Sequence, residues 1–174
     1  MAHKAEHAVD LETGAIVGVT VQDANKGDTD TIQATLPEAA AQLEGVAAVT
    51  DAAIAVIDEV VTDKGYHSRT VVCDLKALGI RTYISEPDRG PQSWIAQEAE
   101  RDAVYANRRR IRGYRGKRLL RRRGEVLERP CAHLYETGAL RRAHVRGQSL
   151  TNSTLSWAEK SSLRRTINHH SFSG

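Results

Sequence analysis

The sequence is poor in cysteine, in aromatic residues and in long apolar runs, and each shortage excludes a class of protein. Two cysteines, Cys73 and Cys131, are too few for a disulfide framework, and their surroundings lack the spacing of a zinc site. Aromatic residues make up only 5% of the chain, so a core must rest on Val, Ile, Leu and Ala. The first residues contain no apolar leader, and no apolar run is long enough to cross a membrane. We therefore expect a soluble, cytoplasmic protein that has no membrane partner.

Acidic and basic residues are unevenly distributed along the 174 residues, a length that suits one domain with a core. Residues 1–104 contain 18 Asp and Glu against 8 Lys and Arg, whereas residues 105–174 contain 4 against 17. An asymmetry of this size predicts that the basic half binds a polyanion.

A helix is predicted over residues 27–45, where apolar side chains recur at helical spacing. Asp28 or Asp30 can serve as its N-cap, and Gly45 is a suitable residue for its end. Pro37 lies inside this pattern and predicts a kink or a later start, because proline removes a backbone donor from a helix interior.

The neighbouring segments alternate between strand and helix patterns. Residues 7–23 predict a β-hairpin around an acidic turn that ends in glycine, and residues 57–62 form a β-branched strand pattern. A helix over residues 68–79 and a strand over residues 80–85 follow, and the chain turns helical and basic from residue 95. The order β-β-α-β-α-β predicts an α/β fold with a parallel component in its sheet.

Residues 105–123 form a strongly basic segment, with ten Lys and Arg among nineteen residues and no acid. The planar guanidinium of arginine suits bidentate contact with phosphate, and Tyr105 and Tyr114 are placed to stack or to anchor the segment. A solvated basic face or a flexible arm is the alternative. We expect nucleic-acid contact, because so many uncompensated cations repel one another. The candidate DNA-binding residues are Arg108, Arg109, Arg110, Arg112, Arg115, Lys117, Arg118, Arg121, Arg122 and Arg123.

Two acidic residues stand at positions where chemistry is possible. Asp63 follows the strand of residues 57–62, and acids at the carboxyl end of a strand lie where α/β sheets bind ligands and metals. The alternative is a strand-ending Asp that caps the next turn. Glu128 lies near the start of a helix predicted over residues 127–138, next to the basic segment. Its alternative role is a salt bridge to Arg129 or to an arginine of that segment.

Four segments, taken in order, resemble the catalytic domain of DDE transposases of bacterial insertion sequences. The resemblance covers residues 3–147 and ends abruptly after Gly147. The segments are "HKAEHAVDLETGAIVGVTVQDANKGDT", "DKGYHS", "IRTYISEPDRG" and "RRRGEVLERPCAHLYETGALRRAHVRG".

The resemblance implies a ribonuclease-H-like mixed sheet flanked by helices, with three carboxylates around two divalent ions, Mg²⁺ or Mn²⁺. Paired ions stabilise the attacking and leaving oxygens of a phosphoryl displacement. The resemblance places the second acid on Asp63 and the third on Glu128. Glu125 is a rival for the third acid, because the family has an Arg four residues before its Glu. Arg121 stands in that place for Glu125, whereas Gly124 stands there for Glu128.

The family carries its first acid on a strand that precedes the hairpin, and this chain begins at Met1 just before the hairpin. We therefore expect the first strand and its acid to be missing, since Asp10 matches a different family position. Residues 1–147 then form a partial catalytic domain. Ten of the 26 residues from 149 to 174 are Ser or Thr, and we expect residues 148–174 to be disordered or frame-shifted.

The implied activity is metal-dependent cleavage and transfer of DNA strands during transposition of an insertion element. The implied partners are DNA, as element ends and as target, and a second copy of the chain in a transpososome. With its first acid missing, the chain is expected to be an inactive transposase fragment. One alternative is a catalytically inactive DNA-binding remnant that acts through its arginine-rich segment, and another is an unrelated nucleic-acid-binding module.

Overall fold

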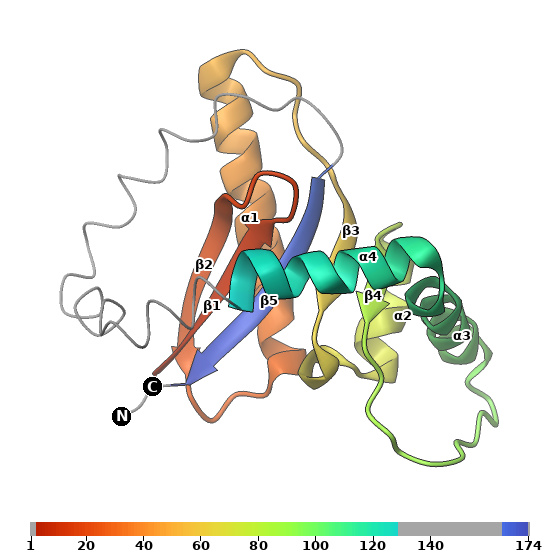
Figure 1. Ribbon diagram of the computed structural model, residues 1–174. Helices are drawn as coiled ribbons and strands as arrows, with labels where there is room; N and C mark the ends of the chain where they lie inside the picture. The colour runs from red at the N-terminus through yellow and green to blue at the C-terminus, as the bar shows by residue number, and fades with distance from the viewer. Residues whose placement is uncertain (1–2, 129–164, 174) are drawn as a thin grey trace.

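The computed structural model describes residues 3–128 and the backbone of residues 165–173 (Figure 1). In chain order, its elements are β1 (His3–Asp10), β2 (Ile16–Asp23), α1 (Asp28–Thr50), β3 (Ile57–Thr62), the 3₁₀ turn η1 (Lys64–Tyr66), α2 (Arg69–Ala77), β4 (Arg81–Ile84), α3 (Glu98–Arg112), α4 (Tyr114–Arg123), the π-helical turn η2 (Gly124–Glu128) and β5 (Arg165–Ser173).

The strands form one mixed sheet in the order β2-β1-β5-β3-β4. β1 pairs antiparallel with β2 and with β5, whereas β3 pairs parallel with β4 and with β5. Helix α1 runs along one face of the sheet, and α4 crosses the other (Figure 1). The predicted mixed α/β class is confirmed, while the ribonuclease-H-like arrangement stays a prediction.

The hairpin turns where the sequence predicts, and Asp10 holds the turn. The backbone N–H of Gly14 donates to the carbonyl of Asp10, and Gly14 adopts the left-handed conformation at φ 76° that favours glycine. The two carboxylate oxygens of Asp10 accept from the Glu12 N–H and the Thr13 hydroxyl. Asp10 is fully buried, and these hydrogen bonds of its carboxylate lie within the hairpin turn.

The predicted end of the first helix at Gly45 is wrong, because α1 continues to Thr50 and ends where Asp51 adopts a left-handed conformation. Ala47 is buried beyond Gly45, so packing continues past the glycine and extends the helix. Pro37 also lies inside α1. Both Pro37 and Gln33, whose carbonyl loses its helical partner, are exposed, so water can bind that carbonyl.

Two apolar clusters cover the two faces of the sheet, because side chains alternate along each strand. Val60 packs in the cluster formed with α1, α2 and α3, and the next residue, Val61, packs with Leu119 of α4. The core is built mainly from Val, Ile, Leu and Ala, as predicted, with Tyr66 as its largest fully buried side chain. Neighbouring residues of β3 therefore place their side chains on opposite faces of the sheet.

Residues 165–173 form the C-terminal strand β5 at the centre of the sheet. Of the two alternatives predicted for residues 148–174, disorder does not apply to these nine residues, and the frame shift stays a prediction. Without β5, the facing edges of β1 and β3 have unpaired backbone groups, and β5 pairs with both. Residues 148–164, and most of the helix predicted over 127–138, lie outside the described residues.

Candidate functional site

Asp63 directly follows β3 and begins η1. Its Oδ1 accepts the backbone N–H of Gly65 at 2.8 Å, so it caps this turn. The backbone at Asp63 is extended, with φ −78° and ψ −177°, so the alternation of β3 continues and the side chain leaves on the face of Val61. That is the face that α4 covers. Among the described residues, none donates to the second carboxylate oxygen of Asp63, which is available to a ligand.

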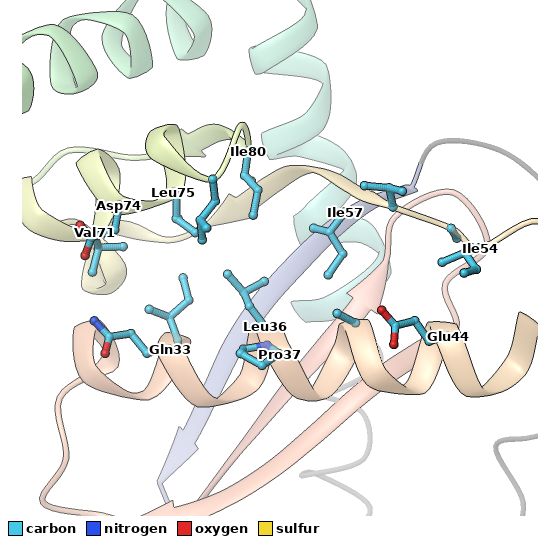
Figure 2. Close-up of a pocket in the computed structure, with 15 residues that line it drawn as sticks. Gln33, Leu36, Pro37, Glu44, Ile54, Ile57, Val71, Asp74, Leu75 and Ile80 are labelled. Carbon is cyan, nitrogen blue, oxygen red and sulfur yellow. The ribbon is translucent and has the colours of Figure 1, made fainter.

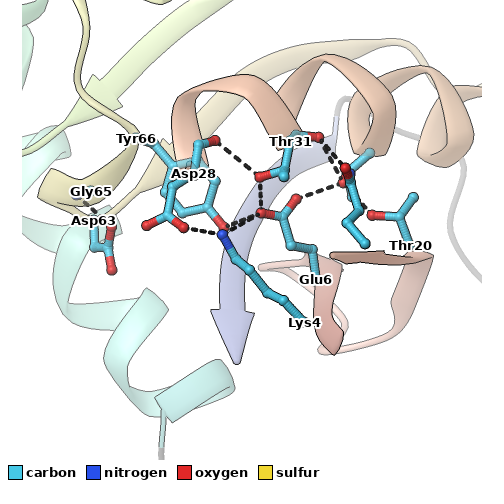
Figure 3. Close-up of polar contacts among 10 residues, drawn as sticks. Lys4, Glu6, Thr20, Asp28, Thr31, Asp63, Gly65 and Tyr66 are labelled. Atoms are coloured by element: carbon cyan, nitrogen blue, oxygen red, sulfur yellow. Dashed lines mark hydrogen bonds and ion pairs between the residues drawn. The ribbon is translucent and has the colours of Figure 1, made fainter. Parts of the chain in front are cut away.

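A second carboxylate, that of Asp28, lies against the turn that Asp63 begins (Figure 3). A Cβ atom added to Gly65 would overlap Oδ2 of Asp28 and would lie 3.1 Å from Oδ1 of Asp63. The two carboxylates are therefore neighbours, and both lie next to Gly65. A side chain at this position would have to displace the carboxylate of Asp28, so glycine suits it.

Glu6 of β1 lies beneath the same turn and is completely buried. Its Oε1 accepts from the Thr31 hydroxyl and, at 3.1 Å, from the Tyr66 hydroxyl. Its Oε2 accepts from the Thr35 hydroxyl at 2.8 Å. These donors compensate the carboxylate for its lost hydration and join β1, α1 and η1 at one point.

The buried ammonium group of Lys4 connects the two acids. It donates to Oδ1 of Asp28 and lies 3.5 Å from Oε1 of Glu6. Burial raises the pKa of Tyr66, and the negative charges of Glu6 and Asp28 raise it further. Tyr66 therefore stays neutral and acts as a hydrogen-bond donor. We call Lys4, Glu6, Asp28 and Tyr66 the Lys4 cluster.

The two glutamates proposed from the resemblance lie on η2, and each has an arginine partner. Glu128 Oε1 accepts from Arg123 at 2.5 Å, which is the salt bridge considered as its alternative role. Glu125 lies 3.8 Å from Arg122. Across residues 3–128, no group of three or more His, Cys, Asp and Glu side chains is placed to hold a metal ion. The assignment of Asp63 and Glu128 as catalytic and metal-binding residues, with Glu125 as rival, stays a prediction.

The basic segment divides into two equal sets, and the first set has partners within the domain. Arg108 makes a bidentate pair with Glu86 at 2.6 Å, and Arg115 donates to the buried Glu59. Arg110 donates to the backbone and hydroxyl of Thr82. The remaining members are Arg122, which donates to the Leu11 carbonyl, and Arg123, which pairs with Glu128.

The second set is exposed, and the described part of the chain supplies no hydrogen bond or ion pair to it. Its members are Arg109 and Arg112 on α3 and Lys117, Arg118 and Arg121 on α4. Arg121 is four residues from Lys117 and three from Arg118, so the three cations lie on one side of the helix. Tyr114, at 84% exposure, precedes them on this face. The structure thus reduces ten candidate phosphate contacts to five.

His67 is a buried side chain near the end of β3 that the sequence did not single out. Neither ring nitrogen forms a hydrogen bond with a described residue. Burial lowers its pKa, the charge of Glu86 raises it, and the charges of Arg89 and Arg108 lower it again. The imidazole is therefore held neutral.

An apolar cavity of about 540 Å³ lies between α1, α2 and the segment that leads into β3 (Figure 2). It is lined mainly by apolar side chains such as Ile32, Leu36 and Leu75. Such a lining offers few ligands to a metal ion or a phosphate, so the cavity is separate from the chemistry considered at Asp63.

Comparison with known protein families identifies the family of the chain. A model of the family described as Transposase DDE domain matches residues 2–170. The match continues beyond residue 147, where the resemblance of the motifs ends. No match is found among curated proteins or among solved structures. Within the described residues, no helix has the length and apolar character needed to cross a membrane.

Proposed function

The chain belongs to the transposase DDE domain family, and from this premise we propose that its exposed cations bind DNA and that Asp63 binds a catalytic metal ion. Transposases act on DNA, and the DDE family uses divalent metal ions. One observation carries the proposal: Asp63 leaves the sheet on the face that α4 covers, and α4 carries three exposed cations.

The exposed set of α3 and α4 is suited to the phosphate backbone of a duplex. Its five cations have no described internal partner, so DNA binding does not break ion pairs of the fold. In contrast, cations of the other set bind α3 and α4 to the sheet through Glu59 and Thr82 and to the segment after β4 through Glu86. We assign phosphate binding to the exposed set and a structural role to the internal set.

Asp63 suits a hard divalent ion, because it offers a carboxylate oxygen and Mg²⁺ and Mn²⁺ prefer oxygen ligands. Glu128 is the proposed third acid of the family pattern, with Glu125 as its rival. Each is engaged by an arginine, so a metal ion has to compete with Arg123 or Arg122 for it. When bound, a pair of such ions stabilises the attacking and leaving oxygens of DNA strand cleavage and transfer. Assembly as a homodimer on element ends belongs to the same proposal.

A second candidate function is DNA binding without strand cleavage. It is favoured by the arginine partners of both glutamates and by the absence of a three-carboxylate group within the described residues. The two functions share the exposed cations and differ only in the metal site. They are therefore separated by a measurement on that site.

The experiment compares Asp63→Asn with Asp88→Asn in the full chain. Asp88 is a matched control, because it is exposed and its Oδ1 accepts the N–H of Gly90, just as Asp63 accepts that of Gly65. Mn²⁺ binding is measured by electron paramagnetic resonance, and nicking is measured on duplex DNA that carries the element ends. Loss of Mn²⁺ binding and of nicking in Asp63→Asn, but not in Asp88→Asn, supports strand cleavage at a metal site. DNA binding by the unchanged chain without nicking supports the second function, and absence of DNA binding at low salt rejects both functions.

A further inference from the structure

We propose that Asp28 is a positioning residue for Asp63, and that it acts by holding the turn η1 in place from the N-terminus of α1. The inference rests on the proposed metal-binding role of Asp63. It concerns a residue that the sequence suggested only as a helix cap. The structure gives Gly27 as the N-cap of α1, so Asp28 is free of that role and lies in the first turn.

The turn η1 has little structure of its own. It consists of three residues, Lys64–Tyr66, and its described hydrogen bonds include the one that Asp63 accepts from Gly65 and the one from His67 N–H to the Lys64 carbonyl. Its position therefore depends on contacts with its surroundings. Short 3₁₀ segments have poor internal geometry, and their neighbours decide where they lie.

Asp28 supplies one of these contacts, on the side of Gly65 that faces α1. A Cβ atom on Gly65 would overlap Oδ2 of Asp28, so the carboxylate lies directly against the glycine backbone. The N–H of the same glycine is bonded to Asp63. Gly65 thus lies against two carboxylates, and a displacement of Asp28 gives the turn room to move away from its bond with Asp63.

Asp28 is itself held in place from the core. Its Oδ1 accepts from the buried ammonium of Lys4, which also lies next to Glu6 on the same strand. Tyr66 at the end of the turn donates to Glu6. Two chains of contacts therefore run from β1 to η1, one through Lys4 and Asp28 to Gly65 and the other through Glu6 to Tyr66 (Figure 3).

Asp30 provides a matched control for Asp28. Both acids lie in the first turn of α1, where a negative charge interacts favourably with the helix dipole, but Asp30 is exposed. Asp28→Ala and Asp30→Ala change the net charge and the helix propensity by the same amounts. Any difference between them therefore reports the contacts that only Asp28 makes, which are those with Lys4 and with Gly65 of the turn.

The experiment measures amide exchange at Gly65 relative to Val61 in the full chain by NMR. We expect Asp28→Ala to raise this ratio about tenfold, and Asp30→Ala to leave it unchanged. Asp28→Asn, which removes the charged bond to Lys4, serves as the second variant if the alanine variant does not fold, and it should also raise the ratio. An unchanged ratio in Asp28→Ala, or in Asp28→Asn if the alanine variant does not fold, overturns the proposal. The ratio needs neither metal nor DNA, so it decides the proposal even if Asp63 binds no metal ion.

Mn²⁺ affinity of the folded variants separates positioning from a purely structural role. A positioning role predicts several-fold weaker Mn²⁺ binding in Asp28→Ala than in Asp30→Ala, whereas a structural role lowers only the urea midpoint. A double-mutant cycle adds an independent check. Gly65→Ala should cost less stability when Asp28 is also replaced by Ala, because the overlapping carboxylate is gone. Additive effects in this cycle contradict the contact on which the proposal depends.

Discussion

Replacing Lys117, Arg118 and Arg121 together by alanine should weaken DNA binding in a way that depends on salt. These three cations share the exposed face of α4 and have no described partner inside the domain. Their removal therefore leaves the packing of Leu119 against the sheet intact and deletes three phosphate contacts. The affected quantity is the slope of log K against log salt concentration, since each contact releases bound counterions.

The expected slope follows from the number of exposed cations, which is five. At about 0.9 per phosphate contact, five contacts give a slope of about −4.5, so binding weakens roughly 500-fold between about 50 and about 200 mM salt. The triple variant keeps Arg109 and Arg112, which give a slope of about −1.8 and a loss of roughly tenfold over the same range. At the lower salt concentration the two proteins already differ in affinity, and the difference narrows as salt rises.

Fluorescence anisotropy with a labelled duplex measures these slopes. The control is the triple exchange of Arg108, Arg110 and Arg115 for alanine, which removes the same charge from cations with internal partners. It should keep a slope near that of the unchanged chain and lose stability instead. Single exchanges of Arg118 and Arg108 repeat the comparison if the control triple unfolds. Equal changes of slope in the two sets, or a slope near zero for the unchanged chain, would refute the division of the basic segment.

Three further predictions concern stability. The pKa of His67 is lower in the folded state than its unfolded value of 6.5, so the stability that the neutral imidazole contributes is present above pH 6.5 and is lost as pH falls through the folded pKa. His67→Leu should therefore flatten the fall of the urea midpoint between about pH 7.5 and about pH 5. Asn107→Ala should cost about 2–4 kcal/mol of unfolding free energy, because the buried N–H and carbonyl of Ile84 lose their partner, whereas exposed Asn25→Ala should cost little. Deleting residues 165–174 should lower the urea midpoint strongly and expose apolar surface to a hydrophobic dye, and an unchanged midpoint would contradict the central place of β5.

Local patterns were sufficient for the elements whose ends are set by their own residues. The strand Ile57–Thr62 has the predicted bounds, and the helix Arg69–Ala77 begins after the Ser68 cap and ends before Gly79, which is left-handed at φ 78°. Asp63 was placed correctly at the end of its strand for the same reason. In these cases the caps and the apolar periodicity agree with the tertiary packing.

Long-range contacts account for what the sequence did not predict. The centre of the sheet is filled by β5, which pairs with β1 across more than 150 residues of chain, and no local pattern reports such pairing. Likewise, Lys4 meets Asp28 across 24 residues, and Tyr66 meets Glu6 across 60. The sequence suggested Asp28 only as a helix cap, and no local pattern pairs it with Lys4 or pairs Tyr66 with Glu6, so the fold is needed to reveal the Lys4 cluster.

The charge asymmetry between the halves of the chain has two components in the folded protein. Part of it is neutralised internally, since Glu59 and Glu86 of the acidic half pair with Arg115 and Arg108 of the basic half. These bidentate pairs join α4 to β3 through the buried Glu59 and α3 to the segment after β4 through Glu86. The cations left over are those whose side chains face solvent on α3 and α4. Composition alone counts every Lys and Arg of the basic segment as a phosphate ligand, whereas the salt dependence is decided by the number of these cations that have no described partner inside the domain.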